Sequence, residues 1–291
     1  MADSVIEFRN AVARVFGPIE LTPIGDGQIH RFRVPGDRAG TQNGWYALHA
    51  DGVAFGVFGS WKTGGFHSWS SRKPADPLDC ELLRVRMEQA RRQREAEQCQ
   101  RQQATVVQAA RLWNQAVPAD PRHPYLARKG VQPRGLRQLG DMLLVALYHN
   151  GQLANLQRIY PDGGKRFLPG GRVNGCYSPV GALLPGLPLY LCEGWATGAT
   201  LHEATGAPVA CAMNAGNLLQ AGLELSRRFQ DAVLVVAGDD DRQTEGNPGR
   251  TAATKAAAML GCGLVFPAWP EGAPLTLTDF NDLSLWREGR V

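Results

Sequence analysis

Short apolar runs alternate with longer amphipathic stretches through residues 188–291. The apolar runs have the length of strands, and the stretches between them carry apolar residues at the helical period. Strands that alternate with helices in this way indicate an α/β fold with a mainly parallel sheet flanked by helices. The predicted strands are 189–192, 208–212, 232–237 and 263–266, and the predicted helices are 196–205, 218–229 and 249–260.

The first 75 residues follow a different pattern, with short alternating runs separated by turn residues. The runs 29–34, 44–48 and 53–58 predict a small antiparallel sheet, and the residues before them predict a short helix. Residues 79–117 are polar and rich in Gln, without Gly or Pro, and predict one long helix or two. We therefore expect a small β-rich domain at 1–75 and a solvated helical connector at 76–117.

Residues 118–187 combine a hairpin with a basic loop. Two apolar runs, 143–148 and 153–160, flank the turn His149-Asn150-Gly151, which predicts a β-hairpin. The loop at 161–172 follows it and is rich in Gly and basic residues. Glycines let cationic side chains of such a loop lie close to a polyanion. A solvated basic loop is the alternative interpretation.

The composition indicates which class of protein to expect. No apolar run approaches the ~18 residues that a membrane helix needs, and the N-terminus has no apolar signal core, so we expect a cytoplasmic protein without membrane contact. None of the six cysteines forms a CxxC pair, so no structural zinc is expected. Residues 1–140 hold 20 Lys and Arg against 13 Asp and Glu, whereas residues 141–291 hold 11 against 14. A basic part joined to an acidic part suits polyanion binding beside a metal site, although solvated Arg-rich helices give the same numbers.

Acidic residues follow two of the predicted strands. Glu193 comes directly after the strand 189–192, and Asp239, Asp240 and Asp241 come after the strand 232–237. Chemistry in parallel sheets collects at the carboxyl ends of strands. If these strands are neighbours, the carboxylates converge, and like charges packed together need a hard cation such as Mg²⁺. A plain acidic turn is the alternative.

A further acidic segment, 278–283, follows the last strand. Asp279 fits two roles there, as an additional metal ligand or as the N-cap of a final helix running to about Glu288. The two roles are compatible.

The order and spacing of these motifs resemble the Toprim domain of phage- and plasmid-encoded DNA primases and, more distantly, the DnaG-type bacterial primases. The resemblance covers about residues 110–288. It rests on Cys192-Glu193-Gly194-Trp195-Ala196-Thr197, Leu201-His202-Glu203-Ala204-Thr205-Gly206, Ala215-Gly216-Asn217-Leu218, Ala237-Gly238-Asp239-Asp240-Asp241, Asn247-Pro248-Gly249-Arg250 and Asp279-Phe280-Asn281-Asp282-Leu283.

The resemblance implies a DNA primase that makes short RNA primers on single-stranded DNA from NTPs. Residues 188–291 would be the metal-binding catalytic domain and 118–187 a basic primase-core subdomain. Glu193, Asp239 and Asp241 would be catalytic, and with Asp279 they would hold Mg²⁺ or Mn²⁺. The resemblance also implies a phosphate-binding set, namely Arg158, Lys165, Arg166 and Arg172.

The sequence departs from these primases in three places. The β-rich domain has no cysteine, so it would be zinc-free, and its basic and aromatic residues either contact DNA or, for the tryptophans, pack in its core. An acid that DnaG-type enzymes carry four residues after the glutamate is Thr197 here. No G-x-x-x-x-G-K-[ST] loop is present, so a separate replicative helicase is expected as a partner. The DNA-contact candidates are Arg31, Arg33, Trp45, Trp61, Lys62, Trp69 and Arg72.

Two other functions remain open on the sequence. The same metal site is compatible with a Toprim-type nuclease, whereas a topoisomerase would need a tyrosine nucleophile, and no tyrosine has a context that marks it as one. A non-catalytic protein that binds single-stranded DNA in replication or transfer is the second alternative.

Overall fold

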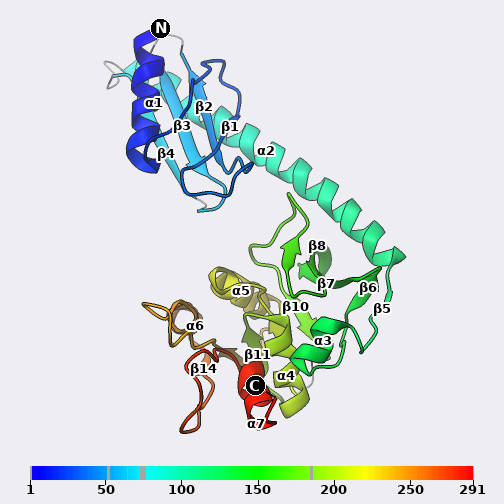
Figure 1. Cartoon of the computed structure of the whole chain (residues 1–291). Coiled ribbons are helices and arrows are strands. Elements are labelled where there is room, and N and C mark those ends of the chain that lie inside the picture. Colours follow the sequence, from blue (N-terminus) through cyan, green and yellow to red (C-terminus); the bar gives the residue numbers. More distant parts are fainter. Residues whose placement is uncertain (1, 51–52, 64, 73–76, 184–185, 291) are drawn as a thin grey trace. The chain divides into compact units, whose positions relative to one another are not determined.

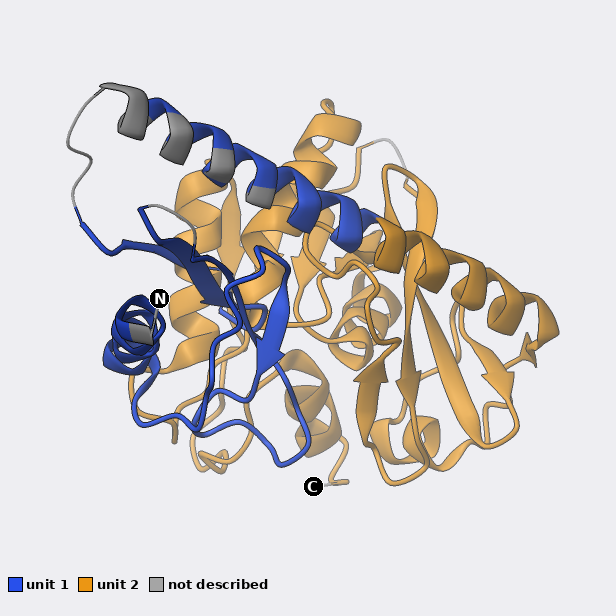
Figure 2. Cartoon of the chain, turned by 90° about the horizontal axis from the view of Figure 1, so that it is seen from above, with its two compact units in different colours: residues 1–99 blue, residues 100–291 orange. Residues whose placement is uncertain are grey.

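A computed structural model describes residues 2–50, 53–63, 65–72, 77–183 and 186–290. The chain forms two compact units, residues 1–99 and 100–291, which are coloured separately in Figure 2. The division falls within the long helix α2 (Pro77–Gln115). The boundary expected between residues 75 and 76 lies within the segment 73–76, which is outside the described residues. The four-part division stays a prediction.

Unit 1 is a four-stranded antiparallel sheet with helix α1 against it (Figure 1). Phe8 of α1 contacts Tyr46 and Phe58 of the sheet, with ring centroids 5.7 Å apart in both pairs. The opposite face of the sheet carries a second cluster, in which Trp45 is almost fully buried. The predicted antiparallel sheet with a preceding helix is confirmed. The elements are α1 (Ala2–Phe16), β1 (His30–Phe32), β2 (Gly44–His49), β3 (Phe55–Ser60) and β4 (Phe66–Ser70).

The first sheet of unit 2 is antiparallel, with the strand order β5-β6-β7-β8-β9. Its central pair, β7 and β8, is the predicted hairpin. One face packs against the end of α2, where Leu144 and Leu156 meet Ala109. The elements are β5 (Val117–Pro118), α3 (Pro124–Lys129), β6 (Arg137–Leu139), β7 (Met142–His149), β8 (Gln152–Ile159) and β9 (Lys165–Phe167).

The second sheet of unit 2 has the order β10-β12-β11-β13-β14, and every pair is parallel except the pair of β10 with β12. The predicted alternation of strands and helices is therefore confirmed. The elements are β10 (Ser178–Val180), β11 (Leu189–Cys192), α4 (Trp195–Thr205), β12 (Val209–Cys211), the 3₁₀ turn Ala215–Asn217, α5 (Leu218–Arg228), β13 (Leu234–Ala237), α6 (Pro248–Leu260), β14 (Gly263–Val265) and α7 (Phe280–Arg287).

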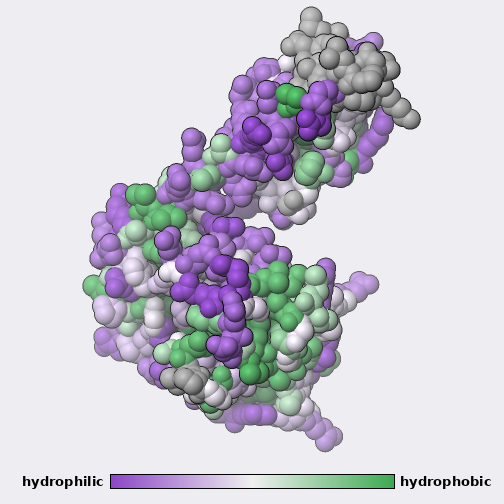
Figure 3. Space-filling view, turned by 180° about the vertical axis from the view of Figure 1, so that it is seen from behind, coloured by the Kyte–Doolittle hydropathy of each residue, from purple (hydrophilic) through white to green (hydrophobic). Residues whose placement is uncertain are grey.

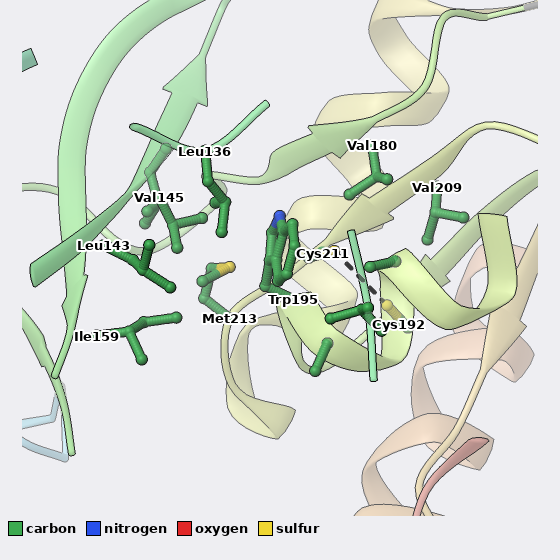
Figure 4. Packing of buried hydrophobic residues seen from close by; sticks show 14 of the residues in the cluster. Leu136, Leu143, Val145, Ile159, Val180, Cys192, Trp195, Val209, Cys211 and Met213 are labelled. Carbon is green, nitrogen blue, oxygen red and sulfur yellow. Dashed lines mark hydrogen bonds between the residues drawn. The ribbon is translucent and has the colours of Figure 1, made fainter. Parts of the chain in front are cut away.

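The two sheets of unit 2 share one core, which fixes the hairpin beside the α/β sheet. Leu143, Val145 and Ile159 of the hairpin belong to the same buried cluster as Trp195 of α4 (Figure 4). Helix α4 lies close to its sheet because residue 198 is glycine, and a Cβ there would stand 2.3 Å from Cys211 Sγ. Cys192, the last residue of β11, also belongs to this cluster, so the core supports the strand that ends at Glu193.

The surface of unit 2 includes an apolar area on the side seen in Figure 3. Exposed large hydrophobic residues of this unit include Leu183, Leu187 and Val233. Among the helices of the described residues, none has the length and apolar character required to cross a membrane.

Candidate metal centre

The acidic residues follow two strands that are direct neighbours. Strands β11 and β13 run parallel, and Cys192 at the end of one is paired with Ala237 at the end of the other. Glu193 and the Gly238-Asp239 pair therefore leave the sheet at the same edge. The condition on which the sequence-based site depended, that these two strands are adjacent, is met.

Asp239 is buried among the other acids. Burial raises the pKa of Asp239 to about 8, and the negative charges of Asp279 and Glu193 contribute to the rise. Its Oδ1 atom is buried and has no hydrogen-bond partner among the described residues. A buried carboxylate oxygen without a donor is costly unless a cation or bound water compensates it.

Glu193 lies beside the same acids. Burial raises the pKa of Glu193, and the charge of Asp241 adds to the rise. The ammonium of Lys165 acts in the opposite direction and lowers the pKa of this carboxyl group. Glu193 is therefore within electrostatic reach of the other carboxylates and of Lys165 on β9.

Asp241 is fixed by the N-terminus of α6. Its Oδ2 accepts a hydrogen bond of 2.8 Å from the backbone N–H of Gly249, and its own N–H donates to Asn247 Oδ1. A Cβ at position 249 would stand 2.8 Å from Asp241 Oδ2 and 3.0 Å from Asp239 Cβ. Glycine at this position is what lets the helix approach both aspartates.

Asp240, in the middle of the run, has a different environment. Its carboxylate accepts hydrogen bonds from Asn247 Nδ2 at 2.7 Å, Arg250 Nε at 2.9 Å and Trp269 Nε1 at 3.0 Å. The bond from Arg250 is the main cause that lowers the pKa of Asp240. Both carboxylate oxygens accept hydrogen bonds, so Asp240 links the start of α6 to the loop that contains Trp269.

Asp279 caps helix α7, as one of its two predicted roles requires. Its Oδ1 accepts from the N–H of Asp282 at 2.7 Å. Its Oδ2 accepts from the hydroxyl of Thr197 at 2.9 Å. Thr197, where the resemblance to DnaG-type primases would imply an acid, is thus the residue that holds the second oxygen of Asp279.

The predicted phosphate-binding residues do not form one set in the structure. Lys165 pairs with Ile159 across β8 and β9, and therefore lies on the sheet face that meets the α/β domain. Arg158 pairs with Leu144 on one side and Arg166 on the other, and Leu144 packs beneath α2. Directly paired residues share a face, so these two arginines lie on the opposite face from Lys165.

Arg172 lies in a third place. Its Nε donates to Asn174 O at 3.2 Å, and together with His149 it borders a depression beside α5. Of the four basic residues, Lys165 is the one that the structure brings to the acids.

Tyr125 is a residue of this site that the sequence did not single out for a role here. It is almost fully buried, and the ammonium of Lys165 lies 5.6 Å from its ring centroid. Burial raises the pKa of Tyr125 to about 12, and its hydroxyl has no hydrogen-bond partner among the described residues. The sequence signal that could have placed Tyr125 is its position in His123-Pro124-Tyr125-Leu126. This run predicts the start of a helix, with His123 as its N-cap and Pro124 in its first turn.

The C-terminal part of the chain, residues 188–289, matches the family described as Toprim domain. These residues form a Toprim domain. The Toprim fold expected from the motifs is confirmed.

Two relatives extend the similarity beyond the Toprim domain. Both are proteins of Escherichia coli named DNA primase TraC, 34% and 36% identical to 93% and 90% of this chain. The chain spans 27% and 19% of the length of these relatives. The resemblance to Toprim-domain DNA primases is therefore confirmed, and it includes the β-rich unit and α2.

Toprim domains bind divalent metal ions such as Mg²⁺. Within the described part of the chain, no three His, Cys, Asp or Glu side chains stand in a ready-made arrangement around one ion position. The donors themselves fit a hard cation, because they are carboxylates and the Oδ1 atom of Asp239 is buried without a donor. Burial also raises the pKa values of Glu193 and Asp239. Glu193, Asp239 and Asp241 are the residues that would hold it.

Proposed function

We propose that this chain is the primer-synthesising part of a DNA primase, which joins NTPs on a single-stranded DNA template. The observation that carries the proposal is the acidic edge of the Toprim domain, where Glu193 and Asp239 follow paired strand ends. The similarity to two proteins named DNA primase supports this choice over other uses of a Toprim domain.

Each residue of the site has a role in this proposal. Glu193, Asp239 and Asp241 hold Mg²⁺ or Mn²⁺, which when bound neutralises phosphate charge and polarises the α-phosphate. Glu193, whose pKa is raised by burial, serves either as this metal ligand or as the base that accepts the proton of the attacking 3′-hydroxyl. Lys165 binds the triphosphate, because its ammonium lies close enough to Glu193 to affect that carboxyl group.

The remaining residues have supporting roles. Asp279 orients α7 and its neighbours rather than serving as a principal ligand, since both of its oxygens already accept hydrogen bonds. Arg158 and Arg166 contact the nucleic acid away from the acids, on the sheet face opposite the one that carries Lys165. In this proposal a separate replicative helicase opens the duplex.

The proposal is tested by primer synthesis on single-stranded DNA with NTPs and Mg²⁺ or Mn²⁺. We expect short RNA products from the unaltered chain and a loss of roughly 100-fold or more in Asp239→Asn and Asp241→Asn. Glu245→Gln is the matched control, because Glu245 is an exposed acid of the same loop and is expected to leave the rate unchanged.

The same reactions separate the other candidate functions. Cleavage of labelled DNA that depends on Asp239, without primer products, would assign a nuclease. DNA binding without any product, unaffected by both aspartate substitutions, would assign a non-catalytic binding protein. Either result would overturn the primase proposal.

A further inference from the structure

A cavity lies at the edge of the Toprim sheet opposite the acids. It is bordered by Leu189 and Val209, the first residues of two parallel strands, and by Phe229 after α5. Parallel strands have all their carboxyl ends at one edge, so a cavity at their amino ends is separate from the site of Glu193 and Asp239. No role described so far uses it.

The lining of this cavity is apolar, with one charged residue. Tyr148 and Tyr177 contribute aromatic rings from the hairpin side, and Tyr177 is almost fully buried. Leu183 borders the cavity and is 45% exposed, and Leu187, close by in the chain, is 39% exposed. These residues lie in unit 2, and Figure 3 shows an apolar area on the surface of this unit. Exposed apolar area around a cavity is typical of a binding surface.

The size of the cavity limits its occupant. Its volume is about 250 Å³, which lies below the ~300–1,000 Å³ typical of sites for drug-sized small molecules. A single bulky apolar side chain is the ligand that this volume suits. Anchor residues of peptides and partner proteins bind in pockets of this kind.

Arg228 indicates which charge the occupant should carry. Its guanidinium lies beside Gly151, where a Cβ would stand 2.4 Å from Nη1, and 5.4 Å from the ring centroid of Phe229. Its neighbour Arg227 pairs with Glu224, whereas Arg228 has no ion pair within the described residues. A cation beside an apolar pocket without a carboxylate of its own complements an anionic group next to the anchor.

We propose that this cavity, the Arg228 pocket, binds a segment of a partner protein in which a bulky apolar residue stands next to a carboxylate. The side chain fills the space between Tyr148, Tyr177 and Phe229, and the carboxylate pairs with Arg228. A nucleic-acid strand fits less well, because its backbone needs several cations in a row and the pocket offers one. The inference does not depend on the primase proposal, since the pocket and the acids lie at opposite edges of the sheet.

The test uses the whole chain and fluorescein-labelled octapeptides of Gly and Ser that end in Phe. The peptide with a free C-terminal carboxylate is expected to bind with a Kd of about 10–500 µM. The same peptide as a C-terminal amide is expected to bind roughly fivefold or more weakly, because it lacks the partner of Arg228. A peptide ending in Ser is expected to lose binding, because it lacks the anchor.

Protein variants then assign the binding to the pocket. Arg228→Gln is expected to lower the affinity of the acid to that of the amide and to leave the amide unaffected. Leu183→Asp, at an exposed position on the rim, is expected to weaken both peptides. Lys255→Gln, an exposed change on α6 in the same domain, is the matched control and is expected to change neither. Primer synthesis should be unaffected in all three variants.

Several outcomes would overturn the inference. Equal affinity for the acid and the amide, or acid binding that survives Arg228→Gln, would remove the charge pairing. No binding of any peptide at about 1 mM would exclude the pocket as an anchor site. A dimer in light scattering that Leu183→Asp dissociates would assign the surface to a second copy of this chain. Displacement of the peptide by oligo-dT would assign it to nucleic acid.

Discussion

Asp239 and Asp240 are adjacent, yet the same substitution to Asn is expected to change stability in opposite directions. Asp240→Asn keeps the shape of the side chain but removes its charge. Asp240 is 4% exposed, and its carboxylate accepts hydrogen bonds from three donors, on Asn247, Arg250 and Trp269. The NH2 group of the new Asn has to face at least one of these three donors. That donor then has no acceptor.

The size of the loss follows from these contacts. The bond from Arg250 is charge-assisted, and it is counted at the lower end of the ~1.5–3 kcal/mol range because Arg250 is 48% exposed. A buried donor without an acceptor costs a further ~1–3 kcal/mol. We therefore expect Asp240→Asn to lower the free energy of unfolding by about 3 kcal/mol. For a unit of this size that is a fall in Tm of roughly 6–12 °C.

Asp239→Asn is the matched comparison. It replaces a buried carboxyl group whose ionised form is disfavoured by burial and whose Oδ1 has no donor. The new amide would donate to the carboxylates around it, which include those of Asp279 and Glu193. In metal-free buffer at pH 7.5 we expect this variant to be more stable than the unaltered chain by roughly 1–3 kcal/mol.

Thermal and urea unfolding followed by circular dichroism measure both effects. The pKa of Asp240 is lowered in the folded protein, so its contribution is complete above the unfolded value of about 3.9. It is lost as the pH falls through the lower folded value. The stability difference between Asp240→Asn and the unaltered chain should therefore be constant from pH 8 to pH 5 and should shrink below about pH 4. Equal destabilisation by both variants, or no effect of Asp240→Asn, would refute the different roles assigned to the two residues.

The remaining predictions concern residues around the acids. Thr197→Val is expected to lower the free energy of unfolding by about 1–2 kcal/mol in urea unfolding, because Asp279 loses a buried hydrogen bond, whereas Thr197→Ser should be close to neutral. Tyr125→Leu is expected to weaken Mg²⁺–NTP binding roughly 2- to 30-fold in calorimetry, because Lys165 loses its contact with the aromatic ring. Tyr125→Phe keeps the ring and should bind as the unaltered chain does. An equal loss in both variants would contradict the cation–π role. Gly198→Ala is expected to lower Tm by several degrees, because its Cβ would overlap a buried cysteine sulfur; an unchanged Tm would show that α4 moves away freely.

The sequence by itself determined the elements of the Toprim domain and the edge of its sheet at which the acids lie. The limits of its predicted strands and helices fall within two residues of those observed. Apolar periodicity is a local property, and it decides whether a segment of this length becomes a strand or a helix. Once β11 and β13 are parallel neighbours, residues that follow them must leave at the same edge, so Glu193 and Asp239 were predictable together.

Only the tertiary structure decided what each side chain does. Three consecutive aspartates look alike in sequence, but Asp240 faces the loop of Trp269 while Asp239 faces the other acids. Lys165 and Arg166 are neighbours in the chain and lie on opposite faces of their sheet, because side chains alternate along a strand. These outcomes depend on strand register and on contacts between residues far apart in the sequence, which no local pattern contains.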